Sequence, residues 1–399
     1  MTVVRPIESF AALGAEEFER SYIRPRVPVM FRVASGPFPP LSWTPRFLAK
    51  TLGGRAARVA ASDSAVFDFD METHRRRFEY LDLPVPEALA LMEAQRDRGT
   101  RHYYWLQQNV FRDLPELRSA IGDAPLAGHR KGPLFTGFWC GGAGNVTRLH
   151  YDEPHNLFVQ CYGRKLFHLL PPDAGPHLYP SSGTDDPFLS RVDFDNPDLT
   201  RFPLFAQAHA VEITLGPGDA LYLPPYWWHT VLSLDMAISV NYWWPPDFAD
   251  LMTPAARQVL PRMYRTNRLS RYRAAFADNP ESGFIGLAER ALDLGYATEA
   301  LLFAGAALED HLHALSVQHG LAYQNLEANN AELARAGAYG DDDRDRIAVY
   351  ARVVDAVARE ERSFDAASAG ELRAGVHAFM QRVPAPVEPW TTPSRVVGT

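Results

Sequence analysis

Between residues 131 and 245 the sequence is a series of short apolar runs separated by turns that contain glycine and proline. The turns include YGRK at 162–165 and LGPGD at 215–219. Many short strands at this spacing are typical of an all-β sandwich or barrel, because each strand must bury one face against another sheet. We therefore expect a mainly β core of the jelly-roll type, with about three strands between residues 212 and 244.

The segments on either side of this β region follow other patterns. Before residue 130, β-branched and aromatic residues predict strands at 24–33 and 101–110, and the sequence 42–54 predicts a capped helix closed by glycine. After WWPPDF at 243–248, apolar residues recur at helical spacing. We expect three parts: a domain at 1–250 that combines N-terminal α/β elements with the β core, a helical region at 251–382, and a Pro-rich tail at 383–399.

Composition excludes several classes of protein. The chain of 399 residues can bury one large core or two, and its net charge of −8 argues against a general nucleic-acid-binding surface. It has no run of 18 apolar residues and no signal-peptide pattern at its start, so we expect no membrane association and a cytoplasmic protein. Cys140 and Cys161 lie in apolar, strand-like contexts, which favours buried thiols over a disulfide.

The stretch TRLHYDEPHNLFVQCYGRKLFHLLPP, residues 147–172, places His150 and Asp152 two positions apart just before an apolar hairpin. Residues i and i+2 of a strand point to the same face, so both side chains can hold one ion. His229, which follows GPGDALYLPPYWW, is the candidate third ligand. Two histidines and a carboxylate leave open positions on Fe(II), as an oxygenase requires, whereas a structural zinc site closes its fourth position with protein. His155, five residues from His150, is expected to point the other way.

Lys165 is one of only three lysines among 40 basic residues. It lies on the hairpin partner of the predicted ligand strand. Fe(II) oxygenases commonly use 2-oxoglutarate, whose remote carboxylate needs a buried cation. A lysine kept in an arginine-rich chain indicates a slot that fits a slender ammonium group. The alternative is a surface lysine that follows a turn.

These motifs, together with SVNYWW at 239–244, resemble the JmjC/cupin-like 2-oxoglutarate oxygenases, and most of all the subgroup of the asparaginyl hydroxylase that inhibits hypoxia-inducible factor. The resemblance covers residues 100–245 and, more weakly, 20–60. It implies a double-stranded β-helix (jelly-roll/cupin) core and a catalytic domain at 1–250. It also implies a set of site residues: iron ligation by His150, Asp152 and His229, contacts of Thr147 and Lys165 with the remote carboxylate of 2-oxoglutarate, and positions for Asn156 and Asn241 near its metal-bound end.

One position departs from the family pattern. The family usually has a tyrosine, hydrogen-bonded to the same carboxylate, in the strand that reads YYWLQQ here. Alignment on LQQ places Trp105 at that position, with Tyr104 beside it. Either the register shifts by one residue, or the indole N–H of Trp105 replaces the hydroxyl group.

The resemblance implies a dioxygenase with Fe(II), 2-oxoglutarate and dioxygen that hydroxylates a side chain of a protein or peptide. N-methyl demethylation and hydroxylation of a small molecule or nucleoside use the same core, so they stay open. A cupin-like metal protein that does not use 2-oxoglutarate would not need Lys165 and Thr147. A pseudoenzyme scaffold would not need an intact metal triad. Substrate choice is expected to depend on the N-terminal part and on the loop at 181–202.

The helical region carries two apolar stripes. One comprises Phe284, Leu287, Ala291 and Leu294, and the other runs from Leu301 to Leu315. Such helices must bury these faces, and related enzymes often dimerise through C-terminal helices, so we expect a homodimer. The alternative is a helical bundle within one chain, which costs no association entropy.

Overall fold

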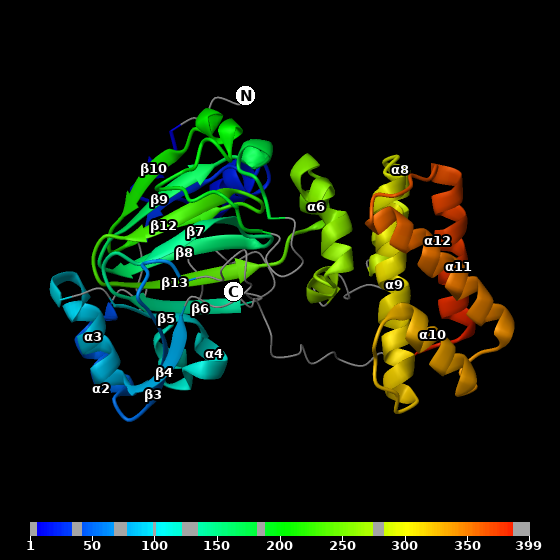
Figure 1. Ribbon diagram of the computed structural model, residues 1–399, viewed down its shortest axis with the longest axis horizontal. Helices are drawn as coiled ribbons and strands as arrows, with labels where there is room; N and C mark the ends of the chain where they lie inside the picture. Colours follow the sequence, from blue (N-terminus) through cyan, green and yellow to red (C-terminus); the bar gives the residue numbers. More distant parts are fainter. Residues whose placement is uncertain are drawn as a thin grey trace. The chain divides into compact units, whose positions relative to one another are not determined.

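In the computed structural model the chain is described for residues 6–33, 42–67, 78–98, 101–121, 135–181, 188–273 and 283–385 (Figure 1). It divides into two compact units, one up to Pro246 and one from Asp247. Each unit is described by itself below. The predicted Pro-rich tail lies outside the described residues from position 386 onward.

The first unit is built on two β-sheets. The larger sheet has the strand order β1-β2-β11-β8-β13-β6-β5-β3-β4, and the smaller has the order β10-β9-β12-β7. All pairings are antiparallel except that of β1 with β2. The strands of the larger sheet are β1 (Glu8–Phe10), β2 (Val29–Arg32), β3 (Ala56–Ser62), β4 (Glu79–Pro84), β5 (His102–Asn109), β6 (Phe135–Gly141), β8 (His155–Tyr162), β11 (Asp219–Leu223) and β13 (Ala237–Trp244). Those of the smaller sheet are β7 (Val146–Tyr151), β9 (Lys165–Leu170), β10 (Val211–Leu215) and β12 (Trp228–Ser233).

The two sheets enclose an apolar interior. It contains Phe158 and Leu221 from the larger sheet, and Phe167, Leu169 and Val231 from the smaller one. This arrangement confirms the predicted jelly-roll core. The expectation of about three strands between residues 212 and 244 was wrong: four strands, β10 to β13, occupy this part, because each turn between them takes only a few residues.

The opposite face of the larger sheet is covered by the N-terminal elements. Alternate residues of β13, such as Ile238, Val240 and Tyr242, join a core with residues of the helices. The helices of this part are α1 (Ala15–Phe18), which continues as the π-helix η1 (Glu19–Ile23), α2 (Pro45–Leu52), α3 (Val85–Arg98), α4 (Val110–Asp113) and the 3-10 helix η3 (Pro115–Ala120). The predicted cap at 42–54 is confirmed, since the Thr44 side chain accepts a hydrogen bond from Phe47 N.

Three further short elements complete the first unit and begin the second. The 3-10 helices η4 (Pro172–His177) and η5 (Pro203–Gln207) lie in the connection between β9 and β10. The helix α5 (Phe248–Leu251) opens the second unit with a capping box made by Asp247 and Asp250.

The second unit is a helical bundle, as the helical spacing predicts. Helix α9 (Ala297–Gln318) is buried over most of its length and contacts each of the other long helices. These are α6 (Pro254–Arg265), α8 (Phe284–Asp293), α10 (Leu326–Arg335), α11 (Asp341–Ala358) and α12 (Ala366–Arg382), with a 3-10 turn η6 (Leu269–Tyr272) after α6. None of the described helices is long and apolar enough to span a bilayer.

The apolar stripes of the helical region are buried within this unit. Phe284, Leu287 and Ala291 of the first stripe belong to its core, as do the apolar residues of the second, while Leu294 is 57% exposed. The need to bury these faces therefore gives no support to the predicted homodimer, which stays a prediction.

Candidate metal centre

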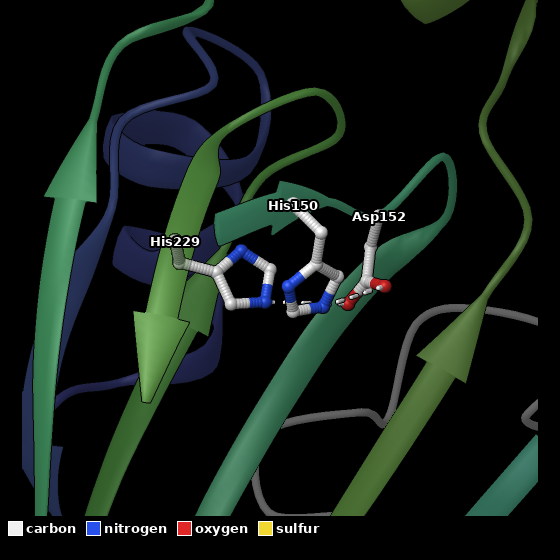
Figure 2. A group of neighbouring side chains, drawn as sticks. All are labelled: His150, Asp152 and His229. Carbon is white, nitrogen blue, oxygen red and sulfur yellow. Dashed lines mark ion pairs between the residues drawn. The ribbon is translucent and has the colours of Figure 1, made fainter. Parts of the chain in front are cut away.

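His150, Asp152 and His229 meet at one end of the smaller sheet (Figure 2). His150 lies on β7 and His229 directly opposite it on β12, while Asp152 follows the last residue of β7. Each residue offers one ligand atom within 4.8 Å of the others. The Nε2 atoms of His150 and His229 lie 4.0 Å and 3.9 Å from the Asp152 carboxylate oxygens. Period-2 spacing on one strand and a returning strand thus bring the three predicted ligands together.

Backbone carbonyl groups fix the orientation of both histidine rings. His150 Nδ1 lies 2.7 Å from the carbonyl oxygen of Arg148, and His229 Nδ1 lies 3.0 Å from that of Trp227. Because a carbonyl oxygen can only accept, each Nδ1 carries a proton, and in the neutral ring this leaves Nε2 with a lone pair. Burial, followed by the nearby His150, lowers the pKa of His229 to about 4, although Asp152 opposes the shift. His229 is therefore neutral near pH 7, as a metal ligand must be.

Two side chains hold the Asp152 carboxylate. Its Oδ2 accepts hydrogen bonds from Asn156 Nδ2 at 2.8 Å and from Trp243 Nε1 at 3.1 Å. Asn241 Nδ2 in turn donates to Asn156 Oδ1 at 2.8 Å. Asn241 and Asn156, both named in the sequence analysis, thus form a chain of hydrogen bonds that ends at the carboxylate of Asp152. Trp243 was missed, although its position two residues after Asn241 on β13 places both on one face.

His155 does not belong to the group, as its spacing predicts. It is fully buried at the start of β8 on the face that packs against the N-terminal elements. Its Nδ1 lies 2.8 Å from the Tyr222 hydroxyl, and its ring stacks on that of Trp244.

Lys165 begins β9 and points into the interior between the sheets, where it is only 3% exposed. The alternative of a surface lysine was therefore wrong. Its Nζ donates to Ser239 Oγ at 3.0 Å and lies 5.2 Å from the ring centre of Phe158. None of the ion pairs in the described part of the chain includes Lys165. Burial lowers its pKa to about 8. A buried ammonium group without a carboxylate partner is costly, which indicates a site for an anion.

The two cysteines lie near Lys165 and are buried, unpaired thiols, as predicted. Burial raises the pKa of Cys140 to about 12 and raises that of Cys161 as well, with the charge of Lys165 opposing both shifts. Both therefore stay protonated near neutral pH and are unreactive.

Tyr104 and Trp105 point to opposite faces of β5. The Tyr104 side chain forms a hydrogen bond with Thr147, and the centre of its ring lies 5.8 Å from Lys165 Nζ. Trp105 points to the opposite face, where it packs edge-on against Phe138. Tyr104 thus lies in the same interior as Lys165 and Thr147, and burial raises its pKa, which keeps its hydroxyl protonated.

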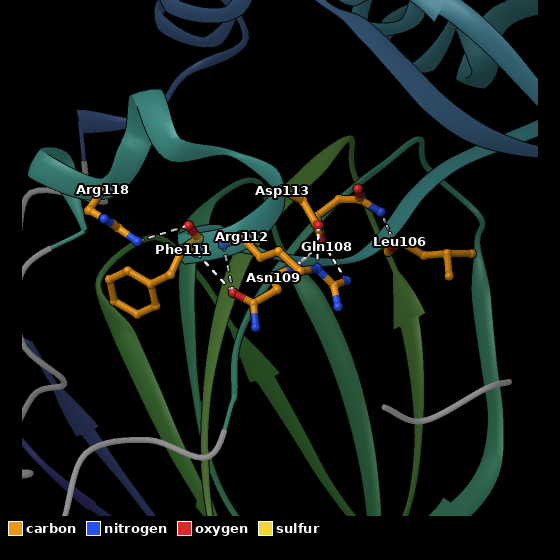
Figure 3. A network of polar contacts seen from close by, with 7 residues as sticks. All are labelled: Leu106, Gln108, Asn109, Phe111, Arg112, Asp113 and Arg118. Carbon is orange, nitrogen blue, oxygen red and sulfur yellow. Dashed lines mark hydrogen bonds and ion pairs between the residues drawn. The ribbon is translucent and has the colours of Figure 1, made fainter. Parts of the chain in front are cut away.

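The strand β5 carries one extra residue relative to its partner β6. Its pairing with β6 slips between Trp105 and Gln108, and Gln108 Nε2 donates to the carbonyl oxygen of Leu106 within this stretch (Figure 3). Asn109 then caps α4 by accepting from the backbone N–H groups of Phe111 and Arg112, which fixes the end of the strand. An extra residue of this kind cannot be seen in a gapless alignment on LQQ.

The comparison with known families agrees with this architecture. The cupin-like domain family matches residues 15–250. The chain belongs to the cupin-like domain family. This match and the names of several relatives together confirm the predicted likeness to JmjC/cupin-like proteins.

Relatives of this cupin-like chain include proteins named for the JmjC class or for demethylation. It is 31% identical over 242 residues to Lysine-specific demethylase JMJ30 of Arabidopsis thaliana, which covers 60% of this chain and 54% of that protein. It is 30% identical over 233 residues to Lysine-specific demethylase 8 of Xenopus tropicalis, covering 57% and 50%. It is 33% identical over 227 residues to HSPB1-associated protein 1 of Rattus norvegicus, covering 52% and 46%. The matches span about half the length of these curated relatives.

Proposed function

We propose that this cupin-like chain is an Fe(II)- and 2-oxoglutarate-dependent dioxygenase that hydroxylates a side chain of a protein or peptide. The family assignment and the relatives named as demethylases support a role in oxidation of this kind. The observation that carries the proposal is the combination of a His-Asp-His group with Lys165, a buried lysine that has no carboxylate partner among the described residues and lies between the same two sheets.

The proposed iron ligands are His150, Asp152 and His229, and their chemistry fits the metal. Two neutral imidazoles and one carboxylate on one side of an ion are the donors of Fe(II) oxygenases. The group among the described residues holds three such side chains and no fourth, which leaves room for a chelating cosubstrate. Bound Fe(II) would supply the redox chemistry that links dioxygen and the decarboxylation of 2-oxoglutarate to oxygen insertion into a C–H bond. Asn156 and Trp243 would keep the Asp152 carboxylate in place.

Lys165, Thr147 and Tyr104 are the proposed partners of the remote carboxylate of 2-oxoglutarate. On β12, the position opposite Lys165 is Ser233, and His229 is four residues away. Four residues of strand span about 13 Å, of which the lysine side chain covers a part. The remaining distance suits a short dicarboxylate that reaches from the ammonium group to the metal. Asn156 and Asn241 would lie near its metal-bound end.

The test is the conversion of 2-oxoglutarate to succinate by the full chain with Fe(II) in air. The reaction is run with peptides or proteins from the native host, and mass spectrometry searches for singly oxygenated products. The proposal expects succinate that depends on Fe(II), together with oxygenated product. A protein that binds metal but consumes no 2-oxoglutarate would instead be a cupin-like metal protein of another kind.

Demethylation is the second candidate, because two of the relatives carry that name. Hydroxylation of an N-methyl group releases formaldehyde, whereas hydroxylation of a side-chain carbon leaves the added oxygen on the substrate. Measuring formaldehyde and oxygenated peptide in the same reactions separates the two. Hydroxylation of a small molecule or nucleoside would leave every peptide unchanged while 2-oxoglutarate is consumed.

We also propose that residues 1–250 carry catalysis and that 251–382 form a separate helical region. The homodimer and the cytoplasmic location remain predictions. Static light scattering at micromolar concentration tests the dimer: a mass near the monomer's 44.6 kDa would contradict it.

A further inference from the structure

Tyr151 lies between two of the proposed metal ligands and faces away from them. It separates His150 from Asp152 in the sequence, and strand alternation puts its ring on the opposite face of β7. The ring is buried, with 5% of the residue exposed. The same alternation holds on β12, where Trp228 precedes His229 and is also buried.

Tyr151 contacts the segment that carries the third ligand at two points. Its ring centre lies 4.8 Å from that of Trp228 in a T-shaped arrangement and 5.8 Å from that of Tyr226. Trp228 is also the cross-strand partner of Tyr151, in the row next to the His150 and His229 pair. The metal-ligand row on one face is thus backed by an aromatic row on the other. We call Tyr151, Tyr226 and Trp228 the aromatic clasp.

The backbone of Tyr226 adds a direct link to Asp152. Its N–H donates to the Asp152 carbonyl oxygen at 2.8 Å. To do so Tyr226 adopts a φ of +66°, the left-handed region, which is unfavourable for a bulky residue and is kept only where the surroundings enforce it. Tyr226 as a whole is only 3% exposed, so burial of its ring against Tyr151 helps to offset this strain.

These contacts connect all three ligand positions from behind. Asp152 follows the end of β7, so the strand ladder does not fix it as it fixes His150. The Tyr226 N–H and the ring of Tyr151 restrain the backbone of Asp152, while Asn156 and Trp243 hold its carboxylate. Without the backbone restraint Asp152 is held less firmly relative to the two imidazoles, and metal binding must then recover the ordering cost.

We propose that Tyr151, at the centre of the aromatic clasp, is a positioning residue that preorganises the metal ligands. The inference rests on the proposed metal centre. It predicts that loss of the Tyr151 ring weakens metal binding beyond any effect on folding. A residue that serves only core packing would lower thermal stability and leave the affinity of the folded protein for metal unchanged.

The experiment is a titration of the full chain with Mn(II), in which free Mn(II) is measured by electron paramagnetic resonance. The variants are Tyr151→Leu, Tyr151→Phe and the control Phe18→Leu. Phe18 is 2% exposed and makes T-shaped contacts with Phe31 and Tyr222 on the other face of the larger sheet. Melting curves followed by circular dichroism are used to choose a temperature at which every variant is folded. If Tyr151→Leu does not fold, Trp228→Leu replaces it, since it removes one of the two ring contacts.

The proposal expects Tyr151→Leu to bind Mn(II) about tenfold or more weakly, the range found when residues that orient metal ligands are removed. Tyr151→Phe keeps the ring and should bind Mn(II) with the affinity of the wild type. Phe18→Leu should melt at a lower temperature and bind Mn(II) as the wild type does. Equal affinity of Tyr151→Leu and wild type, or an equal loss in Phe18→Leu, would overturn the positioning role. A wild-type chain that binds no Mn(II) would overturn the metal centre itself and this inference with it.

Discussion

The ring centres of His150 and His229 lie 4.1 Å apart, on residues that face each other across β7 and β12. Two imidazoles held this close, both with Nε2 toward one carboxylate, can share a single ion. Because each Nδ1 is hydrogen-bonded to a backbone carbonyl oxygen, neither ring can turn away without losing that hydrogen bond.

Metal content should therefore depend on each member of this group. Removing one of three ligands lowers affinity sharply, so His150→Ala and Asp152→Ala should retain little iron after gel filtration. His168→Ala is the control, since His168 lies on β9 and interacts with Glu212 outside the group. Plasma emission spectrometry measures the iron. Full iron content in both ligand variants would refute the assignment.

Lys165→Met should separate cosubstrate binding from stability. Removing one side of a desolvated charge pair costs about 2–5 kcal/mol, so the concentration of 2-oxoglutarate needed for half-maximal turnover should rise by about tenfold for each 1.4 kcal/mol lost. Iron content should not change. The melting temperature without cosubstrate should hold or rise, because the variant no longer buries an ammonium group that has no carboxylate partner. Lys50→Met, on the exposed side of α2, is the control and should change neither property. An unaltered requirement for 2-oxoglutarate would show that another group holds the carboxylate.

The affinity for 2-oxoglutarate should fall as pH rises above about 8. Burial depresses the pKa of Lys165 from 10.5 to about 8, so the free protein loses this proton as pH passes that value. The unfolded chain keeps the proton up to about pH 10.5. Deprotonation of Lys165 in the folded state therefore makes the free energy of unfolding rise with pH between about 8 and 10.5, and it contributes no pH dependence below about pH 8. The dicarboxylate needs the charged form. Calorimetric titration with Mn(II) present, below and above pH 8, should show the decrease in wild type and not in Lys165→Met.

Tyr104 and Trp105 should behave differently although they are neighbours. Tyr104→Phe removes a hydroxyl group from the proposed carboxylate site, and a hydrogen bond there contributes about 1 kcal/mol, so the requirement for 2-oxoglutarate should rise severalfold. Trp105→Phe leaves a gap in the core on the other face and should lower the melting temperature without changing that requirement. The reverse outcome would place Trp105, and not Tyr104, in the cosubstrate site.

The grouping of His150, Asp152 and His229 was predictable from sequence because it depends on short-range geometry. His150 and Asp152 obey the period of a strand, and His229 follows a turn whose return to β7 the jelly-roll pattern requires. The burial of Lys165 between the sheets was predictable for a similar reason, since one tight turn connects its strand to β8.

Other features depend on interactions that no local pattern shows. The slip between Trp105 and Gln108 decides which side chain faces the interior, and it arises from pairing with β6 far along the chain. Trp243 on β13 donates to Asp152 in the turn between β7 and β8, so this contact appears only once the pairing of β13 with β8 is known. The stripes on α8 and α9 fit a bundle or a dimer equally well, and the sequence does not say which surface covers them.

The most direct test of the account is the formation of succinate from 2-oxoglutarate by wild type and by the His150→Ala and Lys165→Met variants, in air with Fe(II) and peptides from the native host. We expect the wild type to form succinate and to stop when Fe(II) is chelated. His150→Ala should form none, and the rate of Lys165→Met should recover only at higher 2-oxoglutarate. No succinate from an iron-loaded wild type, or equal rates in all three proteins, would contradict a function as a 2-oxoglutarate dioxygenase.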